Sequence, residues 1–371
     1  MWDSILNWYW SESFWLPANV TWQHFKSTKD MTMPQPDDLK IILPLTIVLI
    51  LTRILFERFV AYPFSKFIGV PDVKRKPAEP NKILERVFTT ISKSPDAERI
   101  QGLAKELQWT EKQVRQWFYL KRSANRPTIM KKSTECCWRF LFYCTSFYTG
   151  LYLLHKEKHF FDTRHSWYNY PYYHITKPIY YYYMVEASFY TSLICSQFMD
   201  VRRKDFWPMF IHHNATVVLI VMSYVTNHVR IGCLIILVHD SADYLLEAAK
   251  VFNYGRLQRI CDVTFACFAV IFYVSRLVIY PGWILNTVAF EAREICGHFN
   301  SWYPFMALLS LLQVLHLFWA FFVGRVVYSS LVEGKVDRDS RSDSEESDDE
   351  DSDGKENKSD EAIIQNGKKK L

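Results

Sequence analysis

The chain has 371 residues, of which 17% are aromatic, and its formal net charge is +5. That length could hold two or three soluble domains, but the aromatic residues cluster beside long apolar runs, which a soluble core does not need. The mean hydropathy of -0.09 hides this pattern, because it averages apolar segments with a basic region at 63–137 and an acidic region at 337–361. The eight cysteines lack the C-x-x-C spacing of zinc sites, so a soluble zinc-binding protein is not expected.

The N-terminal segment precedes the first long apolar run, and no basic stretch that would mark a cleavable signal peptide stands before that run. We expect residues 1–38 to form a lumenal segment, in which Asn19 opens an Asn-Val-Thr sequon for N-glycosylation. Residues 39–62 are predicted to form the first transmembrane helix, since a membrane-spanning helix needs about 20 mostly apolar residues.

The basic region that follows, at 67–127, has the pattern of two or three short amphipathic helices. Its segment from Trp109 to Pro127 resembles the recognition helix of a homeodomain, with that helix's core pair and basic end at Trp117, Phe118, Lys121 and Arg122. Leu120 stands where homeodomains carry the adenine-reading Asn, and the front of the domain is truncated. We therefore predict phosphate contact, to lipid head groups or CoA, rather than DNA binding.

Six more segments are long and apolar enough to span a membrane, although several are interrupted by polar groups. They are predicted at 138–155, 179–199, 207–226, 230–249, 262–282 and 303–327. We therefore predict an all-α, polytopic membrane protein of about seven transmembrane helices, with a small helical cytosolic insert at 67–127 and a disordered acidic tail at 333–371.

Lysine and arginine residues gather in three loops that lie on one side of a seven-span chain, at 63–137, 202–204 and 250–259. The excess of positive charge predicts that this side faces the cytosol, with the N-terminus in the lumen and the C-terminus in the cytosol. The last four residues, Lys-Lys-Lys-Leu, match a dilysine retrieval signal, which predicts the endoplasmic reticulum membrane.

Two neighbouring spans carry ionisable side chains at membrane depth, where each costs about 2.5–3.5 kcal/mol and usually has a function. The first span holds His212 and His213, and the second holds His239, Asp240, Asp243 and Glu247. The three acids recur at spacings of three and four residues, which places them on one stripe of a helix, while His212 and Thr216 share a face of the other helix.

The depths of these groups also agree. At about 1.5 Å per residue, His212 lies roughly 6–9 Å inside the membrane and Asp243 roughly 10 Å inside, both measured from the cytosolic ends of their spans. A histidine that is oriented by a carboxylate can serve as a general base or as a nucleophile in acyl transfer. Two other interpretations remain open, a structural hydrogen-bond cluster and a metal site, although the H-x-x-H-H boxes of membrane hydroxylases are missing.

The pair His212-His213 followed by the run His-Asp-Ser-Ala-Asp at 239–243 resembles the signature of the ceramide synthases, within the TLC-domain family. The resemblance covers nearly the whole chain and implies a TLC domain at 131–332, folded as a helical barrel around a lipid channel. It implies N-acylation of sphinganine or sphingosine by acyl-CoA, with no metal or bound cofactor. The residues that carry over as catalytic are His212, His213, Asp240 and Asp243.

Other residues are expected to contact the substrates, acyl-CoA and a sphingoid base: Arg202, Arg203, Lys204, Thr216, His239 and Glu247. The family's acyl-chain preference is attributed to the stretch before the last span, here 284–303. A TLC protein that binds or moves lipid without catalysis is the alternative, and a homodimer or heterodimer stays open.

The tail carries three serines with an acidic residue three positions further on, at Ser340, Ser342 and Ser347. This spacing predicts phosphorylation by an acidophilic kinase of the casein kinase type. Added phosphate would compete with CoA for the basic loop at 202–204.

Overall fold

The structure is a computed structural model that describes residues 10–29, 31–72, 77–125 and 127–333. Every regular element in these ranges is helical and none is a strand, so the predicted all-α fold is confirmed there. The chain divides into two compact units, one with residues up to Val70 and from Ser133 onward, and the other with Pro71–Lys132. The three candidate phosphorylation sites, Ser340, Ser342 and Ser347, lie outside the described residues.

The larger unit begins with short helices and one long helix: α2 (Glu12–Trp15), η1 (Trp22–Phe25), η2 (Pro36–Ile41), α3 (Ile42–Phe56), η3 (Glu57–Ala61) and α4 (Tyr62–Phe67). It continues with α8 (Ile129–Leu154), α9 (Lys158–Phe161), η4 (Thr163–Ser166), α10 (Lys177–Ser196), α11 (Phe206–Val225) and α12 (Val229–Tyr254). The last elements are α13 (Gln258–Tyr273), η5 (Val274–Leu285), η6 (Thr287–Glu291), α14 (Ala292–Cys296) and α15 (Trp302–Glu333).

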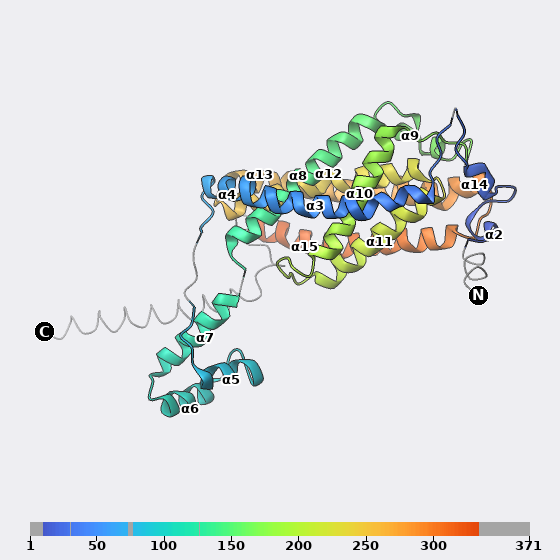
Figure 1. The fold of residues 1–371 in the computed structure, drawn as a ribbon. Helices are drawn as coiled ribbons and strands as arrows, with labels where there is room; N and C mark the ends of the chain where they lie inside the picture. Colours follow the sequence, from blue (N-terminus) through green and yellow to red (C-terminus); the bar gives the residue numbers. More distant parts are fainter. Residues whose placement is uncertain (1–9, 30, 73–76, 126, 334–371) are drawn as a thin grey trace, which may run out of the picture. The chain divides into compact units, whose positions relative to one another are not determined.

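The long helices of this unit lie side by side (Figure 1). Helix α10 packs against α3 and α11, α11 against α15, α15 against η5, and η5 against α12. Helix α12 returns to α10 at Gly232, where a Cβ atom would lie only 2.0 Å from the hydroxyl oxygen of Tyr183. These contacts close a ring of helices, and close approach at a small residue is how helices associate in a membrane.

Four helical stretches are long and apolar enough to cross a membrane, at Pro36–Phe67, Phe206–Val225, Gln258–Cys296 and Trp302–Val332. The chain is therefore a multi-pass membrane protein. The other three predicted spans fall on α8, α10 and α12, which have 26, 20 and 26 residues but carry more charged and polar side chains.

The sixth predicted span, 262–282, is shorter than the helical stretch in the structure, which runs over Gln258–Cys296. The helix continues through Pro281 to Cys296, because the wide turns of η5 and η6 accommodate a proline that would interrupt a regular α-helix. Most of the segment before the last span, 284–303, is consequently helical rather than a loop.

The N-terminal segment packs on the end of the bundle where α15 begins. The backbone N–H of Ser301 donates to the Phe14 carbonyl at 2.7 Å, and its hydroxyl donates to the Trp15 carbonyl at 2.8 Å. The Tyr224 hydroxyl donates to the Asp38 carboxylate at 2.6 Å. Asn19, the candidate glycosylation site, is exposed in this segment.

The smaller unit contains α5 (Lys82–Thr90), α6 (Ala97–Leu107) and α7 (Glu111–Asn125), packed around Phe88, Trp117 and Phe118. The carboxylate of Asp96 caps α6 by accepting from the Arg99 N–H at 3.0 Å. Both basic residues expected to reach phosphate have partners inside this unit. Lys121 pairs with Glu85 at 3.0 Å, and Arg122 donates to the Lys93 carbonyl at 3.0 Å.

Candidate active site

His212 lies on α11 with its side chain buried among three rings from three other helices. The centroid of its imidazole is 6.2 Å from that of Tyr190 on α10, 6.3 Å from that of His239 on α12 and 5.4 Å from that of Trp319 on α15. Its Nδ1 atom is buried and has no hydrogen-bond partner within the described chain. An imidazole with a nitrogen not used by the fold is available to a substrate.

The imidazole of His239 is held at both nitrogens. Its Nδ1 lies 2.7 Å from the carbonyl oxygen of Ile235, and its Nε2 lies 3.1 Å from Nε2 of His316 on α15. The ring of Tyr280 stands edge-on to both imidazoles, at 5.3 Å and 4.8 Å between centroids. His239 therefore presents its ring, rather than a free nitrogen, to its surroundings.

Asp240 is fully buried and turns away from the histidines. Its Oδ2 accepts from the Ser146 hydroxyl on α8 at 2.5 Å, and the same hydroxyl contacts the buried carboxyl group of Glu186 on α10. The single hydroxyl of Ser146 thus links two buried carboxyl groups and joins α8, α10 and α12.

Asp243 is bound by an arginine from the neighbouring helix. Its Oδ1 accepts from Nη2 of Arg276 on η5 at 3.1 Å, and the same nitrogen lies 2.6 Å from the backbone carbonyl of His239. Arg276 is buried, so the pair neutralises a charge that would otherwise be costly in the interior.

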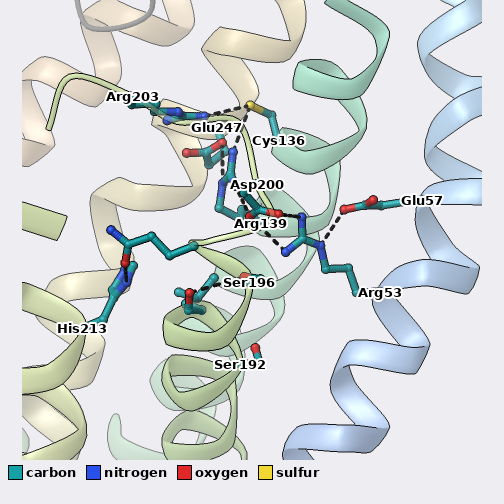
Figure 2. A network of polar contacts seen from close by, with 12 residues as sticks. Arg53, Glu57, Cys136, Arg139, Ser192, Ser196, Asp200, Arg203, His213 and Glu247 are labelled. Atoms are coloured by element: carbon teal, nitrogen blue, oxygen red, sulfur yellow. Dashed lines mark hydrogen bonds and ion pairs between the residues drawn. The ribbon is translucent and has the colours of Figure 1, made fainter. Parts of the chain in front are cut away.

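Glu247 belongs to an ion-pair network at the end of the bundle where α12 finishes (Figure 2). Its carboxylate pairs with Lys250 at 2.8 Å and with Arg139 of α8 at 3.2 Å. Arg139 also approaches Asp200 at 3.8 Å, and Asp200 pairs with Arg53 of α3 at 2.6 Å. The network joins α3, α8 and α12, so the position of the charged Glu247 inside the bundle is explained by its role in holding these helices together.

The basic loop 202–204 lies at the same end of the bundle, directly before α11. Arg202 and Lys204 are exposed, and the guanidinium of Arg202 sits over the Phe206 ring at 4.9 Å. Arg203 is half-buried, and its Nη2 lies 3.9 Å from Sγ of Cys136. These positive groups are reachable by an anionic ligand at the surface.

His213 and Thr216 flank His212 on α11. Nδ1 of His213 contacts the Gln197 side-chain oxygen at 3.3 Å, as Figure 2 shows, which ties α11 to α10. The Thr216 hydroxyl donates to the His212 carbonyl at 2.9 Å, one turn earlier.

An apolar cavity of about 50 Å³ lies between α10, α11, α12 and α15, and its lining includes His239, whose imidazole centroid is 6.3 Å from that of His212. Its wall on α12 reaches from Ile231 to His239, roughly 12 Å at about 1.5 Å per residue. Tyr190 and Thr216 line it near His239, and residues of the far wall are Trp167, His228, Phe299 and Trp302. An apolar cavity with the buried imidazole of His239 in its wall suits a hydrocarbon chain.

The structure brings together only part of the predicted constellation. His212 meets His239, but within the described chain no hydrogen bond joins His212 or His213 to the carboxylates of Asp240 or Asp243. His239 and Asp240 are adjacent in a helix and point about 100° apart, so one faces the cavity while the other faces α8.

Four residues of this region were missed by the sequence interpretation: Ser146, Glu186, Arg276 and His316. Signals for two of them existed, since Glu186 and Arg276 are isolated charged residues in otherwise apolar or aromatic stretches. His316 continues the α15 stripe of Phe305, Leu309 and Leu312, which lines the cavity.

Comparisons with known proteins agree with this architecture. The TLC domain family matches residues 132–325, and the homeodomain family matches residues 75–127. Ceramide synthase 5 of Homo sapiens is 44% identical over 344 residues, which cover 92% of this chain and 88% of that protein. The chain belongs to the ceramide synthase family.

More distant ceramide synthases match over a similar length. Ceramide synthase 4 of Homo sapiens is 41% identical over 347 residues, covering 94% of this chain and 88% of that protein. Ceramide synthase hyl-2 of Caenorhabditis elegans is 30% identical over 353 residues, covering 91% and 94%. The predicted family is thereby confirmed, and the chain is an N-acyltransferase of that family.

Proposed function

We propose that this protein transfers a fatty acyl group from acyl-CoA to the amine of a sphingoid base, sphinganine or sphingosine, and so forms a ceramide or dihydroceramide. The observation that carries the proposal is the buried imidazole of His212, whose Nδ1 has no partner in the described chain and whose ring neighbours Tyr190 and His239 line an apolar cavity. The reaction uses acyl-CoA as a substrate and needs no bound cofactor.

The chemistry that we assign to His212 balances without another reactant. The amine nitrogen forms a bond to the thioester carbonyl carbon, the C–S bond breaks, and the amine proton ends on the CoA thiol. His212 either takes that proton as a general base or first accepts the acyl group on a ring nitrogen. Both routes need a nitrogen that the fold leaves free, and this favours His212 over His239.

The remaining catalytic candidates act around that ring. Asp243 holds Arg276 and thereby the backbone of His239, and Asp240 is linked to Glu186 through the Ser146 hydroxyl. His213 anchors α11 to α10 through Gln197. We assign these residues to orienting the site and keeping its charges in balance.

The two substrates would enter from different directions. The hydrocarbon chain suits the apolar cavity, while the CoA phosphates suit the exposed and half-buried positive charges of Arg202, Arg203 and Lys204. Arginine and lysine are the usual partners of phosphate, so the loop would hold the charged part of acyl-CoA outside the membrane.

The topology that we propose has seven spans, with α8, α10 and α12 added to the four apolar stretches. The basic loops favour an orientation in which the Arg139 end of the bundle lies on the cytosolic side of the endoplasmic reticulum membrane and the exposed Asn19 lies in the lumen. On that cytosolic side, an acidophilic kinase is the expected partner of the serines in the tail.

Purified protein, a sphingoid base and a panel of acyl-CoAs provide the test, with products weighed by mass spectrometry. We expect amide formation that depends on both substrates and is retained when His165, a half-buried histidine that pairs with Asp162 and does not line the cavity, is replaced by Ala. The absence of amide with every acyl-CoA, from folded protein in lipid nanodiscs, would refute the proposed function.

A further inference from the structure

We propose that His316 of α15 is a positioning residue for acyl transfer, which acts through His239 on the ring of His212. This inference rests on the proposed function. His316 is buried, and its Nε2 lies 3.1 Å from Nε2 of His239. It stands on the stripe of α15 that lines the cavity, four residues after Leu312.

The hydrogen positions of this imidazole pair follow from its neighbours. The carbonyl oxygen of Ile235 can only accept, so Nδ1 of His239, at 2.7 Å, carries a hydrogen. In a neutral His239 the other nitrogen, Nε2, then carries no hydrogen and can only accept a hydrogen bond. His316 must therefore carry its hydrogen on Nε2 and donate it to His239.

The pair is held from other sides as well. Arg276 donates to the carbonyl oxygen of His239 at 2.6 Å, which fixes the backbone of that turn of α12. The Tyr280 ring stands edge-on to both imidazoles, and its hydroxyl donates to the Leu309 carbonyl on α15 at 2.9 Å. His239 is thus fixed at its backbone, at both ring nitrogens and along one edge.

The fixed ring of His239 packs near the ring of His212. The two imidazole planes are inclined by only 26°, with 6.3 Å between centroids. Because both ring nitrogens of neutral His239 are hydrogen-bonded, this ring cannot rotate freely, and the His212 ring is oriented by packing near it. A positive charge on His239 would repel the imidazolium that forms at His212, so keeping His239 neutral favours the reaction.

The same face of α15 touches His212 directly, three residues further on. The Trp319 ring stands at 90° to that imidazole with 5.4 Å between centroids, and its indole N–H donates to Asp205 at 3.3 Å. One stripe of α15 therefore contacts both imidazoles, Trp319 by ring packing against His212 and His316 by a hydrogen bond to His239.

Two substitutions of His316 distinguish the effect of its hydrogen bond to His239 from the effect of its packing. His316→Leu keeps apolar bulk but removes the N–H donor, whereas His316→Gln places an amide N–H near the position of Nε2. Leu315→Ala is the matched control, because Leu315 is buried on α15 beside His316 and is not a donor. Each full-length variant is assayed for kcat and KM with acyl-CoA and a sphingoid base, and its thermal midpoint is measured in detergent.

We expect kcat of His316→Leu to fall about 10–100-fold with KM for both substrates nearly unchanged, the loss typical of a displaced catalytic group. His316→Gln should recover most of kcat, and Leu315→Ala should lower the thermal midpoint more than it lowers kcat. If His316→Leu does not fold, the kcat of folded His316→Gln tests the inference: a kcat near that of the wild type supports it, and a large loss of kcat contradicts it.

Wild-type kcat in His316→Leu would overturn the inference, as would a kcat of His316→Gln as low as that of His316→Leu. These outcomes presuppose an active wild-type enzyme. A wild-type protein that forms no amide refutes the proposed function instead, and this inference with it.

Discussion

Arg276 and Asp243 form an ion pair inside the helix bundle, with 3.1 Å between Nη2 and Oδ1. The same guanidinium binds the carbonyl of His239, so the carboxylate is linked through an arginine to the turn of α12 that carries the cavity-lining histidine. This relationship gives Asp243 a role that differs from a direct contact with the imidazole of His212.

Replacing Asp243 by Asn should remove the charge that balances Arg276. We expect turnover to fall by about 100-fold or more, as for the loss of an acid–base partner, because the His239 turn loses its fixed position. The double variant Asp243→Asn, Arg276→Gln leaves no buried unpaired charge, so it should regain folded yield without regaining turnover. Full turnover in the single variant would show that Asp243 serves packing only.

Removing the Ser146 hydroxyl should leave the Asp240 and Glu186 carboxyl groups without their shared partner. We expect Ser146→Ala to cost on the order of 1–3 kcal/mol of stability, the cost of unsatisfied buried polar groups, and to lower turnover. Ser192→Ala is the control, because the buried Ser192 hydroxyl donates within its own helix to the Phe189 carbonyl at 2.6 Å. Equal thermal midpoints for the two variants would contradict this account.

A methyl group at Gly232 should narrow the lipid cavity. The new Cβ would lie 2.0 Å from the Tyr183 hydroxyl oxygen, and both residues line the cavity, so Tyr183 must move. We expect Gly232→Ala to lose activity, most strongly with the longest acyl-CoA in a chain-length series. Gly282→Ala should not, because no atom lies within 4 Å of its added Cβ. If Gly232→Ala shows the same dependence of activity on acyl-chain length as the wild type, the cavity does not bind the acyl chain.

Removing the positive charge of Arg203 should weaken acyl-CoA binding. We expect Arg203→Ala to raise KM for acyl-CoA by about fivefold, as for one charge-assisted contact of about 1 kcal/mol at a half-exposed site. The difference should shrink at high salt. Arg164→Ala, at an exposed arginine that pairs with Glu294, serves as the control. An unaltered KM at low salt would remove Arg203 from the CoA site.

Much of the fold was predictable because the bilayer imposes a simple rule on length and polarity. Hydrophobic runs of about 20 residues located the long helices. The end of the sixth span was not predictable from Pro281, because a proline ends a regular α-helix but wide turns can absorb it.

The candidate site was predictable as a set of residues but not as a set of contacts. Ionisable groups at membrane depth singled out His212, His239 and Asp240, since each is costly there. Their partners could not be deduced, because Ser146 and His316 are 94 and 77 residues away from the residues that they bind. Glu247 shared the stripe of Asp240, yet it pairs with Arg139, which lies at the start of a different predicted span, 138–155.

The central claim is that His212 carries the acyl transfer. The direct measurement is amide formation from acyl-CoA and sphinganine by purified wild-type protein and His212→Ala, matched for folded amount by thermal midpoint. We expect the variant to lose turnover by about 10²–10⁴-fold or more while staying folded, because it removes a buried imidazole nitrogen that has no hydrogen-bond partner in the described chain. Wild-type turnover in folded His212→Ala would contradict the account.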